Sequence, residues 1–321
     1  MPKKLNLHDI SVIIIGAGSI GQRHLRNLLQ LGITNITVSD IDEAKLRSLQ
    51  QKYHIAITTD FSTGHYDVAV ICTPSSFHVS QATQLAEKGT HLFIEKPLSS
   101  SLTGITKLEQ VVLKRRLITM VGCNFRFHPG LIAVKKLIDD QQLGALYSAR
   151  AEFGYYLPFW HNNGRHKQEY SANKSMGGGI ILDRIHEVDY LSWLFGPLKL
   201  KSSLSLKSSD VTNDTEDLSE SIFTSSVVPV ISLHLDYLSQ KYHCFLKIVA
   251  EKGTLLWEFP YQVKLITAES PQAIWSNDVY DINQMYLDEL RYFLDCVATN
   301  SGTISDIFQA KSILSLSLKM R

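Results

Sequence analysis

Short apolar runs alternate with amphipathic segments over the first 120 residues. The apolar runs have the length and composition of buried strands: 11–15, 35–39, 68–72, 91–94 and 117–121. The segments between them carry apolar residues at helical spacing: 22–31, 43–53, 80–88 and 102–114. Strict alternation of strand and helix predicts βαβ units and a parallel sheet.

The pattern changes after residue 125. A helix is expected at 130–141, and helical segments at 283–298 and 307–318. Between them, apolar and polar residues alternate with period two: 198–206, 218–224, 228–237, 243–250 and 254–259. This alternation predicts a mostly antiparallel sheet with one polar face. We therefore expect two domains, at 1–123 and at 124–321.

The composition excludes several classes of function. Lys plus Arg number 32 and Asp plus Glu 31, so no general attraction to nucleic acid or anionic lipid is expected. The longest apolar runs are far too short to cross a bilayer, and the basic N-terminus lacks the apolar core of a signal peptide. The four cysteines form no CxxC pair and predict buried free thiols. We expect a globular, cytoplasmic protein with no nucleic-acid or membrane partner.

Three glycines follow the first predicted strand, as Gly16-x-Gly18-x-x-Gly21 at the start of a predicted helix. In a dinucleotide-binding turn the first allows the tight bend, the second the approach of a pyrophosphate, and the third close packing of helix on sheet. The N–H groups of the helix start, where Ser19 and Ile20 lie, would face the anion.

Asp40 ends the second predicted strand, where an acidic residue of such a fold binds the adenosine ribose. A carboxylate there repels a 2′-phosphate, so we expect NAD as cofactor in preference to NADP. Arg23 and Lys45 are close in sequence and leave NADP open.

Further motifs carry a family resemblance. They are ICTPS at 71–75 with His78, FIEKP at 93–97, NFRFHP at 124–129, and GGGIILDRIHEVD at 177–189. With GAGSIGQRH at 16–24, they resemble the Gfo/Idh/MocA family of NAD(P)-dependent sugar oxidoreductases. The resemblance implies a doubly wound Rossmann domain that binds the dinucleotide, at 1–123. It also implies a second α/β domain for substrate binding and oligomerisation, at 124–321, whose large open sheet often forms an oligomer interface. The active site would lie between the two. We therefore expect a homo-oligomer.

The resemblance also implies roles for individual residues. Lys96 of the EKP triplet would lie near the nicotinamide and the substrate hydroxyl, and Asp183 and His186 would share the catalytic site. The cofactor would further contact these residues: Thr73, Pro74, His78, Glu95 and Lys96 itself. Many members space the aspartate and histidine four residues apart, against three here. On one helix either spacing keeps both side chains on one face.

These residue types suit oxidation of a hydroxyl. A histidine can take the proton because its pKa lies near neutrality, and a lysine cation favours a developing alkoxide. Asp183 would orient His186 or hold a second hydroxyl. Taken singly, a lysine before proline is usually solvated and a helical histidine usually packs, so the assignment depends on the joint order of the motifs.

A segment rich in aromatic residues, YYLPFWH at 155–161, precedes the glycine run. It is a candidate substrate loop, and a hydrophobic packing loop is the alternative. The candidate substrate residues are Arg126, His128, Trp160, His161, Arg165 and Tyr170. No HExxH or comparable spacing occurs, so no metal site is predicted.

The leading hypothesis is an NAD(H)-dependent dehydrogenase or reductase of a sugar or sugar derivative. The motifs RFHP and YLPFWH together look like members encoded among surface-polysaccharide genes. They suggest an amino sugar, a nucleotide sugar or a nonulosonate precursor as substrate. The alternatives are a glycosidase that uses NAD in a transient redox cycle, and a non-catalytic dinucleotide-binding regulator. Lys96, Asp183 and His186 together argue against the regulator, because a sensor needs no proton-transfer groups.

Overall fold

The computed structural model describes residues 10–160 and 164–321. The chain divides into two compact units. The first comprises Met1–Cys123 and Tyr286–Ser312, and the second comprises Asn124–Met285 and Ile313–Arg321. We describe each unit by itself.

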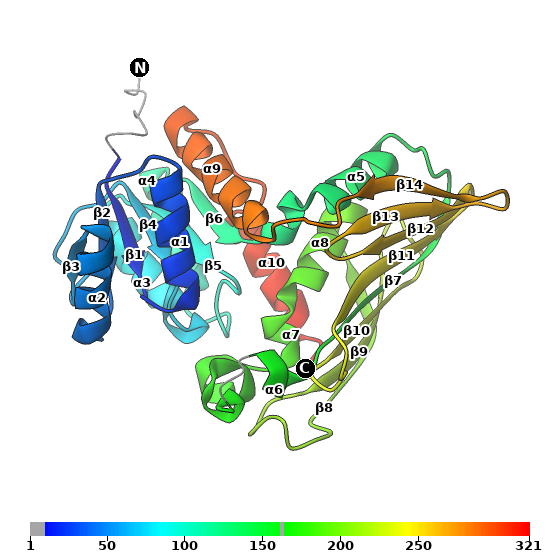
Figure 1. The fold of residues 1–321 in the computed structure, drawn as a ribbon, viewed down its shortest axis with the longest axis horizontal. Helices are drawn as coiled ribbons and strands as arrows, with labels where there is room; N and C mark the ends of the chain where they lie inside the picture. The colour runs from blue at the N-terminus through cyan, green and yellow to red at the C-terminus, as the bar shows by residue number, and fades with distance from the viewer. Residues whose placement is uncertain (1–9, 161–163) are drawn as a thin grey trace. The chain divides into compact units, whose positions relative to one another are not determined.

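The first unit is a six-stranded, fully parallel sheet in the order β3-β2-β1-β4-β5-β6 (Figure 1). Its strands are β1 (Val12–Ile15), β2 (Ile36–Ser39), β3 (Ala56–Thr58), β4 (Val68–Ile71), β5 (His91–Glu95) and β6 (Thr119–Gly122). Its helices are α1 (Ser19–Gln30), α2 (Glu43–Tyr53), α3 (Ser75–Glu87) and α4 (Ile105–Arg115). The order reverses between β1 and β4, and ligands of such sheets bind beyond the carboxyl ends of the strands there. The predicted Rossmann sheet is confirmed.

Two later helices begin or end in this unit, α9 (Asn283–Thr299) and α10 (Ile307–Leu318). Phe293 of α9 packs edge-on against Phe93 of β5, and Ser305 donates a hydrogen bond to the carbonyl of Val121. We predicted residues 286–312 in the second domain, whereas the structure places them in the first unit. An amphipathic pattern shows that a helix buries one face, but it does not show which sheet that face covers.

The second unit is an eight-stranded sheet in the order β14-β13-β12-β11-β7-β10-β9-β8. Its strands are β7 (Leu146–Gly154), β8 (Lys199–Leu206), β9 (Leu218–Thr224), β10 (Ile231–Asp236), β11 (His243–Ala250), β12 (Gly253–Glu258), β13 (Gln262–Ile266) and β14 (Pro271–Ser276). Only β7 and β10 pair in parallel, so the predicted mostly antiparallel sheet is confirmed. β3, β7, β13 and β14 lay outside the predicted strands.

Short helices connect and cover the strands of this unit. They are η2 (Asn124–Phe127), α5 (Pro129–Asp139), α6 (Leu157–Trp160), η3 (His166–Gln168), η4 (Tyr170–Ala172), η5 (Lys174–Met176), α7 (Ile180–Asp183) and α8 (Ile185–Phe195). α5 contacts β12, β13 and β14, while α7 contacts β9 and β10 (Figure 1). Alternate strand residues such as Phe223, Leu233 and Trp257 are fully buried, so this face of the sheet carries the core.

Within the described residues, no helix combines the length and the apolar character that crossing a membrane requires.

Candidate functional site

The glycine turn after β1 has the geometry of an anion-binding turn. Gly16 has a φ of 99°, and a Cβ on it would lie 2.8 Å from the Cys72 carbonyl oxygen. A Cβ on Gly21 would lie 1.9 Å from the Gly16 carbonyl oxygen, whereas one on Gly18 would meet nothing within 4 Å. No side chain caps α1, which begins at Ser19 and Ile20. Gly16 and Gly21 are therefore packed against backbone, whereas the space over Gly18 is open, as the approach of a pyrophosphate requires.

Asp40 is fixed against this turn. Its Oδ2 accepts a hydrogen bond from the backbone N–H of Ala17 at 2.6 Å, and its Oδ1 accepts one from Asp42 at 2.9 Å. Each carboxylate oxygen retains capacity to accept a further hydrogen bond, which suits ribose hydroxyls. The two nearby cations have other contacts: Arg23 lies 4.3 Å above the Tyr286 ring, and Lys45 pairs with Asp42 at 3.7 Å.

His78 links the loops that follow β4 and β5. It is 1% exposed, and its ring nitrogens lie 2.7 Å from the Thr73 carbonyl oxygen and 2.9 Å from that of Pro97. Burial lowers the pKa of His78. The Thr73 hydroxyl donates to Gln81 at 2.6 Å, and Pro74 directly precedes α3. His78 was predicted to contact the cofactor. In the structure its ring contacts the backbone of both loops and so connects them.

Glu95 is buried at the end of β5, beside His24 of α1. Its Oε1 lies 2.6 Å from His24 Nε2, and its Oε2 accepts a 3.2 Å hydrogen bond from the Lys96 backbone N–H. Burial acts to raise the pKa of Glu95, but the hydrogen bond with His24 and the charges of His24 and Lys96 outweigh it and lower the pKa. His24 was not predicted as a site residue, because its only signal in the sequence is its place in GQRH.

In the second unit, Asp183 and His186 do not share one helix. Asp183 ends α7, Arg184 interrupts the helical backbone at φ −103° and ψ 35°, and His186 is the second residue of α8. The expectation of a common helical face is therefore wrong. His186 is 7% exposed, with its ring centroid 4.9 Å from that of Phe125.

Asp183 is 2% exposed and accepts hydrogen bonds from three hydroxyl groups. The Ser171 and Tyr237 hydroxyls each donate to Oδ2 at 2.9 Å, and the Tyr170 hydroxyl donates to Oδ1. Burial and the charge of Asp183 raise the pKa of Tyr237, so its hydroxyl stays a donor. Tyr237 was not predicted, because it follows a strand 54 residues away from Asp183.

Glycine is required before α7 because the backbone of residues 170–173 packs directly against this segment. A Cβ on Gly178 would lie 2.0 Å from the Tyr170 carbonyl oxygen and 2.7 Å from that of Ser171. Gly179 has a φ of 108°, and its Cβ would lie 2.3 Å from Glu216 Oε1. The run therefore holds residues 170–173 directly against α7.

Two of the predicted substrate residues are buried in the second unit and form hydrogen bonds there. Arg126 is buried and binds Asp189 through two hydrogen bonds, Nε to Oδ2 at 2.8 Å and Nη2 to Oδ1 at 2.6 Å. His128 is fully buried, accepts from the Gly130 N–H at 3.1 Å, and lies 3.0 Å from the Pro260 carbonyl oxygen. Burial lowers the pKa of His128 to about 4, so it is neutral at physiological pH.

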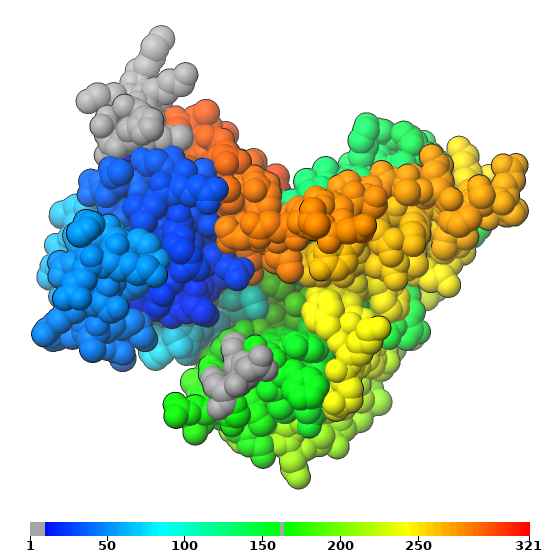
Figure 2. All heavy atoms as spheres, viewed as in Figure 1, coloured from blue at the N-terminus to red at the C-terminus, as the bar shows by residue number. Residues whose placement is uncertain are grey.

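The other candidates belong to the loop between β7 and α7. Trp160 packs edge-on against Tyr237 with ring centroids 5.4 Å apart, Arg165 is exposed, and Tyr170 is half-buried. His161 lies outside the described residues. Figure 2 shows this green segment beside the yellow segment that follows β10, where the Leu157 N–H donates to the Tyr237 carbonyl at 3.0 Å.

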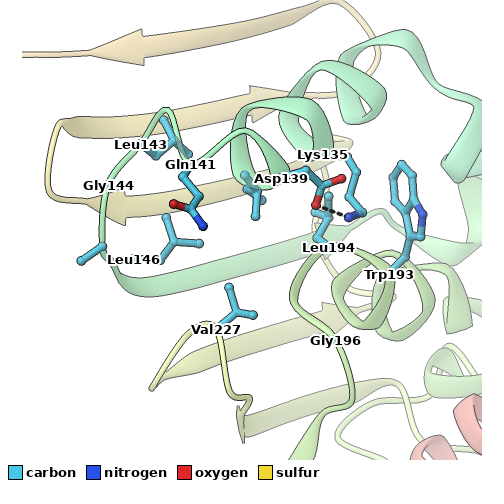
Figure 3. A pocket seen from close by; sticks show the side chains of 12 residues that line it. Lys135, Asp139, Gln141, Leu143, Gly144, Leu146, Trp193, Leu194, Gly196 and Val227 are labelled. Atoms are coloured by element: carbon cyan, nitrogen blue, oxygen red, sulfur yellow. Dashed lines mark hydrogen bonds and ion pairs between the residues drawn. The ribbon is translucent and has the colours of Figure 1, made fainter.

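The second unit also has a cavity of about 720 Å³, which lies away from the predicted site residues (Figure 3). Trp193, the Lys135–Asp139 ion pair and Gln141 line it together with apolar side chains such as Leu146. None of the predicted site residues lines it.

All four cysteines, Cys72, Cys123, Cys244 and Cys296, are buried and free, as predicted.

Comparison with protein families gives two matches. The model of an oxidoreductase family with an NAD-binding Rossmann fold, GFO_IDH_MocA, matches residues 10–123. The model of the GFO/IDH/MocA C-terminal domain matches residues 131–256.

Curated relatives match in part of their length. The Bacillus subtilis oxidoreductase YrbE is 31% identical over 137 residues, which are 41% of this chain and 40% of the relative. The scyllo-inositol 2-dehydrogenase (NAD(+)) of Bacillus subtilis is 26% identical over 197 residues, 59% of this chain and 55% of the relative. The chain thus spans about half the length of these relatives.

Solved structures share the fold over almost the whole chain. Levoglucosan dehydrogenase in complex with NADH and levoglucosan has a TM-score of 0.87 at 15% identity, over 97% of this chain and 95% of that one. Myo-inositol 2-dehydrogenase from Lactobacillus plantarum has a TM-score of 0.80 at 18% identity, over 97% and 96%.

Proposed function

The chain belongs to the Gfo/Idh/MocA oxidoreductase family, and from this we propose that it transfers a hydride between NAD(H) and a carbon of a sugar or related polyol. The observation that carries the proposal is the glycine turn, which is open over Gly18 and bordered by Asp40 in a fixed orientation. The names of relatives, which include inositol and levoglucosan dehydrogenases, support a polyol as the substrate class.

NAD is the proposed cofactor in preference to NADP. The Asp40 carboxylate would accept hydrogen bonds from the ribose hydroxyls and repel a 2′-phosphate. Arg23 and Lys45, the cations that could bind such a phosphate, are engaged by Tyr286 and Asp42. Calorimetric titration with NAD and with NADP tests this preference, and tighter binding of NADP would refute the role of Asp40.

The protein supplies proton transfer and orientation, while the nicotinamide, when bound, exchanges the hydride. His186 is the proposed group that takes or returns the hydroxyl proton, because imidazole titrates near neutrality. Lys96 would stabilise the negative charge that develops on the same oxygen. Glu95, held by His24, fixes the backbone that carries Lys96.

We further propose that the substrate is an amino sugar, a nucleotide sugar or a nonulosonate precursor of surface polysaccharide, and that the enzyme acts in the cytoplasm. The half-buried Tyr170 and the exposed Arg165 remain the candidate substrate contacts. Arg126 and His128 form hydrogen bonds within the second unit, which supports a role in stabilising the fold.

A homo-oligomer formed through the outward face of the eight-stranded sheet is also part of the proposal. That face exposes apolar side chains on neighbouring strands: Leu204 is 59% exposed, Ile222 44% and Leu206 42%. A partner subunit on this face would remove them from water. Light scattering of the purified protein tests it, and a species of only 36.2 kDa at micromolar concentration would refute it.

The decisive experiment incubates the purified protein with NAD, and separately with NADH, against a panel of substrates. The panel holds myo-inositol, levoglucosan, hexoses, amino sugars, nucleotide sugars and their keto forms. A change in absorbance of the reduced nicotinamide that requires both substrate and protein supports the proposal. Release of sugar from glycosides without net reduction would instead identify a glycosidase.

A further inference from the structure

We propose that the cavity lined by α5, the end of α8 and the loop before β7 is a saccharide site, which binds the ring of a neutral sugar or polyol beside Trp193. The volume of this cavity, about 720 Å³, lies within the range of sites that hold small molecules (Figure 3). None of the residues proposed for catalysis lines it, so the inference goes beyond the proposed function.

The lining of the cavity combines buried apolar side chains with exposed polar ones. Leu143 and Leu194 are buried, and Leu146 is half-buried. Asp139 and Gln141 are exposed polar residues of the same lining. A ligand that fills the cavity covers these two side chains, so it must replace the hydrogen bonds that water gives them. A wholly apolar ligand cannot do so.

The charged side chains of the lining already satisfy each other. Lys135 pairs with Asp139 one turn further along α5, and its ammonium nitrogen lies 6.0 Å from the centroid of the Trp193 ring (Figure 3). Lys135 and Asp139 are the charged residues of the lining, so their pairing leaves it without net charge. A cationic ligand would have to displace Lys135 from Asp139, and an anionic ligand would have to displace Asp139 from Lys135.

Two helices end at the cavity, and their ends disfavour an anion further. α5 ends at Asp139 and α8 ends at Phe195, and the lining includes Asp139, Leu194 and Gly196. The C-terminal end of a helix carries a partial negative charge, and its last carbonyl groups have no partner inside the helix. Such carbonyl groups accept hydrogen bonds from hydroxyl groups. The ligand is therefore expected to be neutral and rich in donors.

Gln141 directs a polar group into the cavity from a backbone conformation that favours glycine. It follows α5 with a φ of 55°. Its N–H donates to the Ile138 carbonyl at 3.0 Å, and the Gln142 N–H donates to the Leu137 carbonyl at 3.0 Å, which closes the helix end. The Gln141 amide points into the cavity (Figure 3). An amide both donates and accepts hydrogen bonds, as a hydroxyl group does.

Trp193 determines the shape of the ligand. Its indole is half-buried and lines the cavity on the side of α8 (Figure 3). The face of an aromatic ring is negative and attracts the weakly positive C–H groups on one face of a sugar ring. A ring with an apolar face and hydroxyl groups around its edge therefore matches Trp193, Gln141 and the ion pair together.

Fluorine NMR of the protein labelled with fluorotryptophan tests the proposal at the cavity itself. The chain has four tryptophans, and the resonance that is lost in Trp193→Phe identifies Trp193. The probes are methyl glucoside, methyl galactoside, N-acetylglucosamine and myo-inositol. At least one of them should shift the Trp193 resonance to saturation in the millimolar range. Glucuronate and glucosamine, which carry opposite charges, should bind more weakly than this neutral probe.

Gln141→Gly separates loss of binding from loss of folding. Glycine adopts a φ of 55° without strain from a Cβ, so the thermal midpoint should equal or exceed that of the parent. Loss of one hydrogen bond should weaken binding of the neutral probe by about 2- to 12-fold. Arg116→Gly is the matched control, because it removes a side chain at the same φ of 55° after α4 in the first unit. Its binding should equal that of the parent.

The outcome is distinguishable from that of the proposed reaction. Trp160 ends α6 in the candidate substrate loop, so its resonance reports binding at that loop. A saturating shift of Trp193 without turnover on any panel member would support the saccharide site and refute the proposed reaction. A Trp193 resonance that no neutral probe moves would overturn the inference, as would equal affinities in Gln141→Gly and the parent. Tighter binding of indole or glucuronate than of every neutral probe would also overturn it.

Discussion

The two units each carry a short run of glycines at their candidate site, and the runs work in different ways. In the first unit, Gly16 and Gly21 pack against the backbone of their own turn and of Cys72, and Gly18 leaves open space for a ligand. In the second unit, the space beside the Cα atoms of Gly178 and Gly179 is occupied by other segments: the backbone of residues 170–173 lies against Gly178, and the Glu216 side chain lies against Gly179. The run in the first unit leaves its backbone accessible to a ligand, and the run in the second unit allows a loop of the same chain to pack closely.

This difference extends to the polar groups around each run. The turn of the first unit presents the N–H groups of a helix start, and Asp40 binds the backbone of that same turn. Around the glycine run of the second unit, side chains bind side chains, as Asp183 does with Tyr237 and Ser171. Cofactor binding should therefore tolerate changes in the second unit that abolish the proposed chemistry.

The largest expected effect is the loss of turnover when His186 of the second unit is replaced while NAD binding is retained. His186→Asn retains volume and some hydrogen bonding but cannot exchange a proton near neutrality. We expect turnover to fall by roughly 10²–10⁴-fold, the usual range for general acid–base catalysis. NAD affinity, measured by calorimetry, should stay at the parental value.

The control for this loss is folding. An unchanged thermal midpoint and intact NAD affinity show that the loss is chemical. Single-turnover activity within a few-fold of the parent would mean that another group takes the proton, and Lys96 is then the next candidate.

The next effect concerns the buried ion pair of the second unit. Arg126→Met should destabilise this unit by about 3–5 kcal/mol, because it leaves the Asp189 carboxylate buried without its partner. The double variant Arg126→Met/Asp189→Leu should recover much of the loss, since no charge is then left buried. Urea unfolding measures both. If Arg126 instead read the substrate, Arg126→Met would raise KM and leave the unfolding midpoint in place.

A matched pair of glycine substitutions tests the turn of the first unit. Gly21→Ala should cost about 1–3 kcal/mol of stability, because its Cβ would meet the Gly16 carbonyl at 1.9 Å. Gly18→Ala should fold normally, because its Cβ meets no protein atom, and should weaken NAD binding by roughly tenfold, about 1.4 kcal/mol. Parental NAD affinity in Gly18→Ala would show that no phosphate approaches there.

The contrast also explains what the sequence could predict. The strand, glycine turn and helix of the first unit could be predicted because they are adjacent in the sequence, and Asp40 directly follows the next strand. The partners in the second unit are distant: Asp189 lies 63 residues from Arg126, and Pro260 lies 132 residues from His128. No periodicity encodes such pairings, so buried charged residues resembled ligand contacts. The helix break at Arg184 was equally invisible, since Asp183 and His186 fit one helical face on spacing alone.

The smallest expected effect concerns pH, since a network of side chains titrates and a backbone turn does not. On the outward face of the second sheet, His234 Nδ1 lies 2.6 Å from Glu220, and Nε2 lies 2.9 Å from Asp236. Glu152 stands opposite His234 on β7, where it binds Arg150 at 2.9 Å and lies 3.6 Å from His243. The hydrogen bond to Asp236, with the bond and charge of Glu220, raises the pKa of His234 from 6.5 to about 9.

The sign of the resulting pH dependence follows from that shift. A histidine whose pKa rises on folding contributes stability that is complete below its unfolded pKa of 6.5 and is lost as the pH rises through about 9. For Asp236, burial acts to raise the pKa, but hydrogen bonds from His234, Leu238 and Ser239 lower it to about 2, so its contribution is lost only in strong acid. Partly exposed pairs are worth about 1 kcal/mol or less, so the thermal midpoint should fall by a few degrees between about pH 6 and pH 9.5. His234→Gln should flatten this slope while keeping the midpoint of the parent at high pH. An equal slope in both proteins would place the titrating group elsewhere and remove His234 from the network.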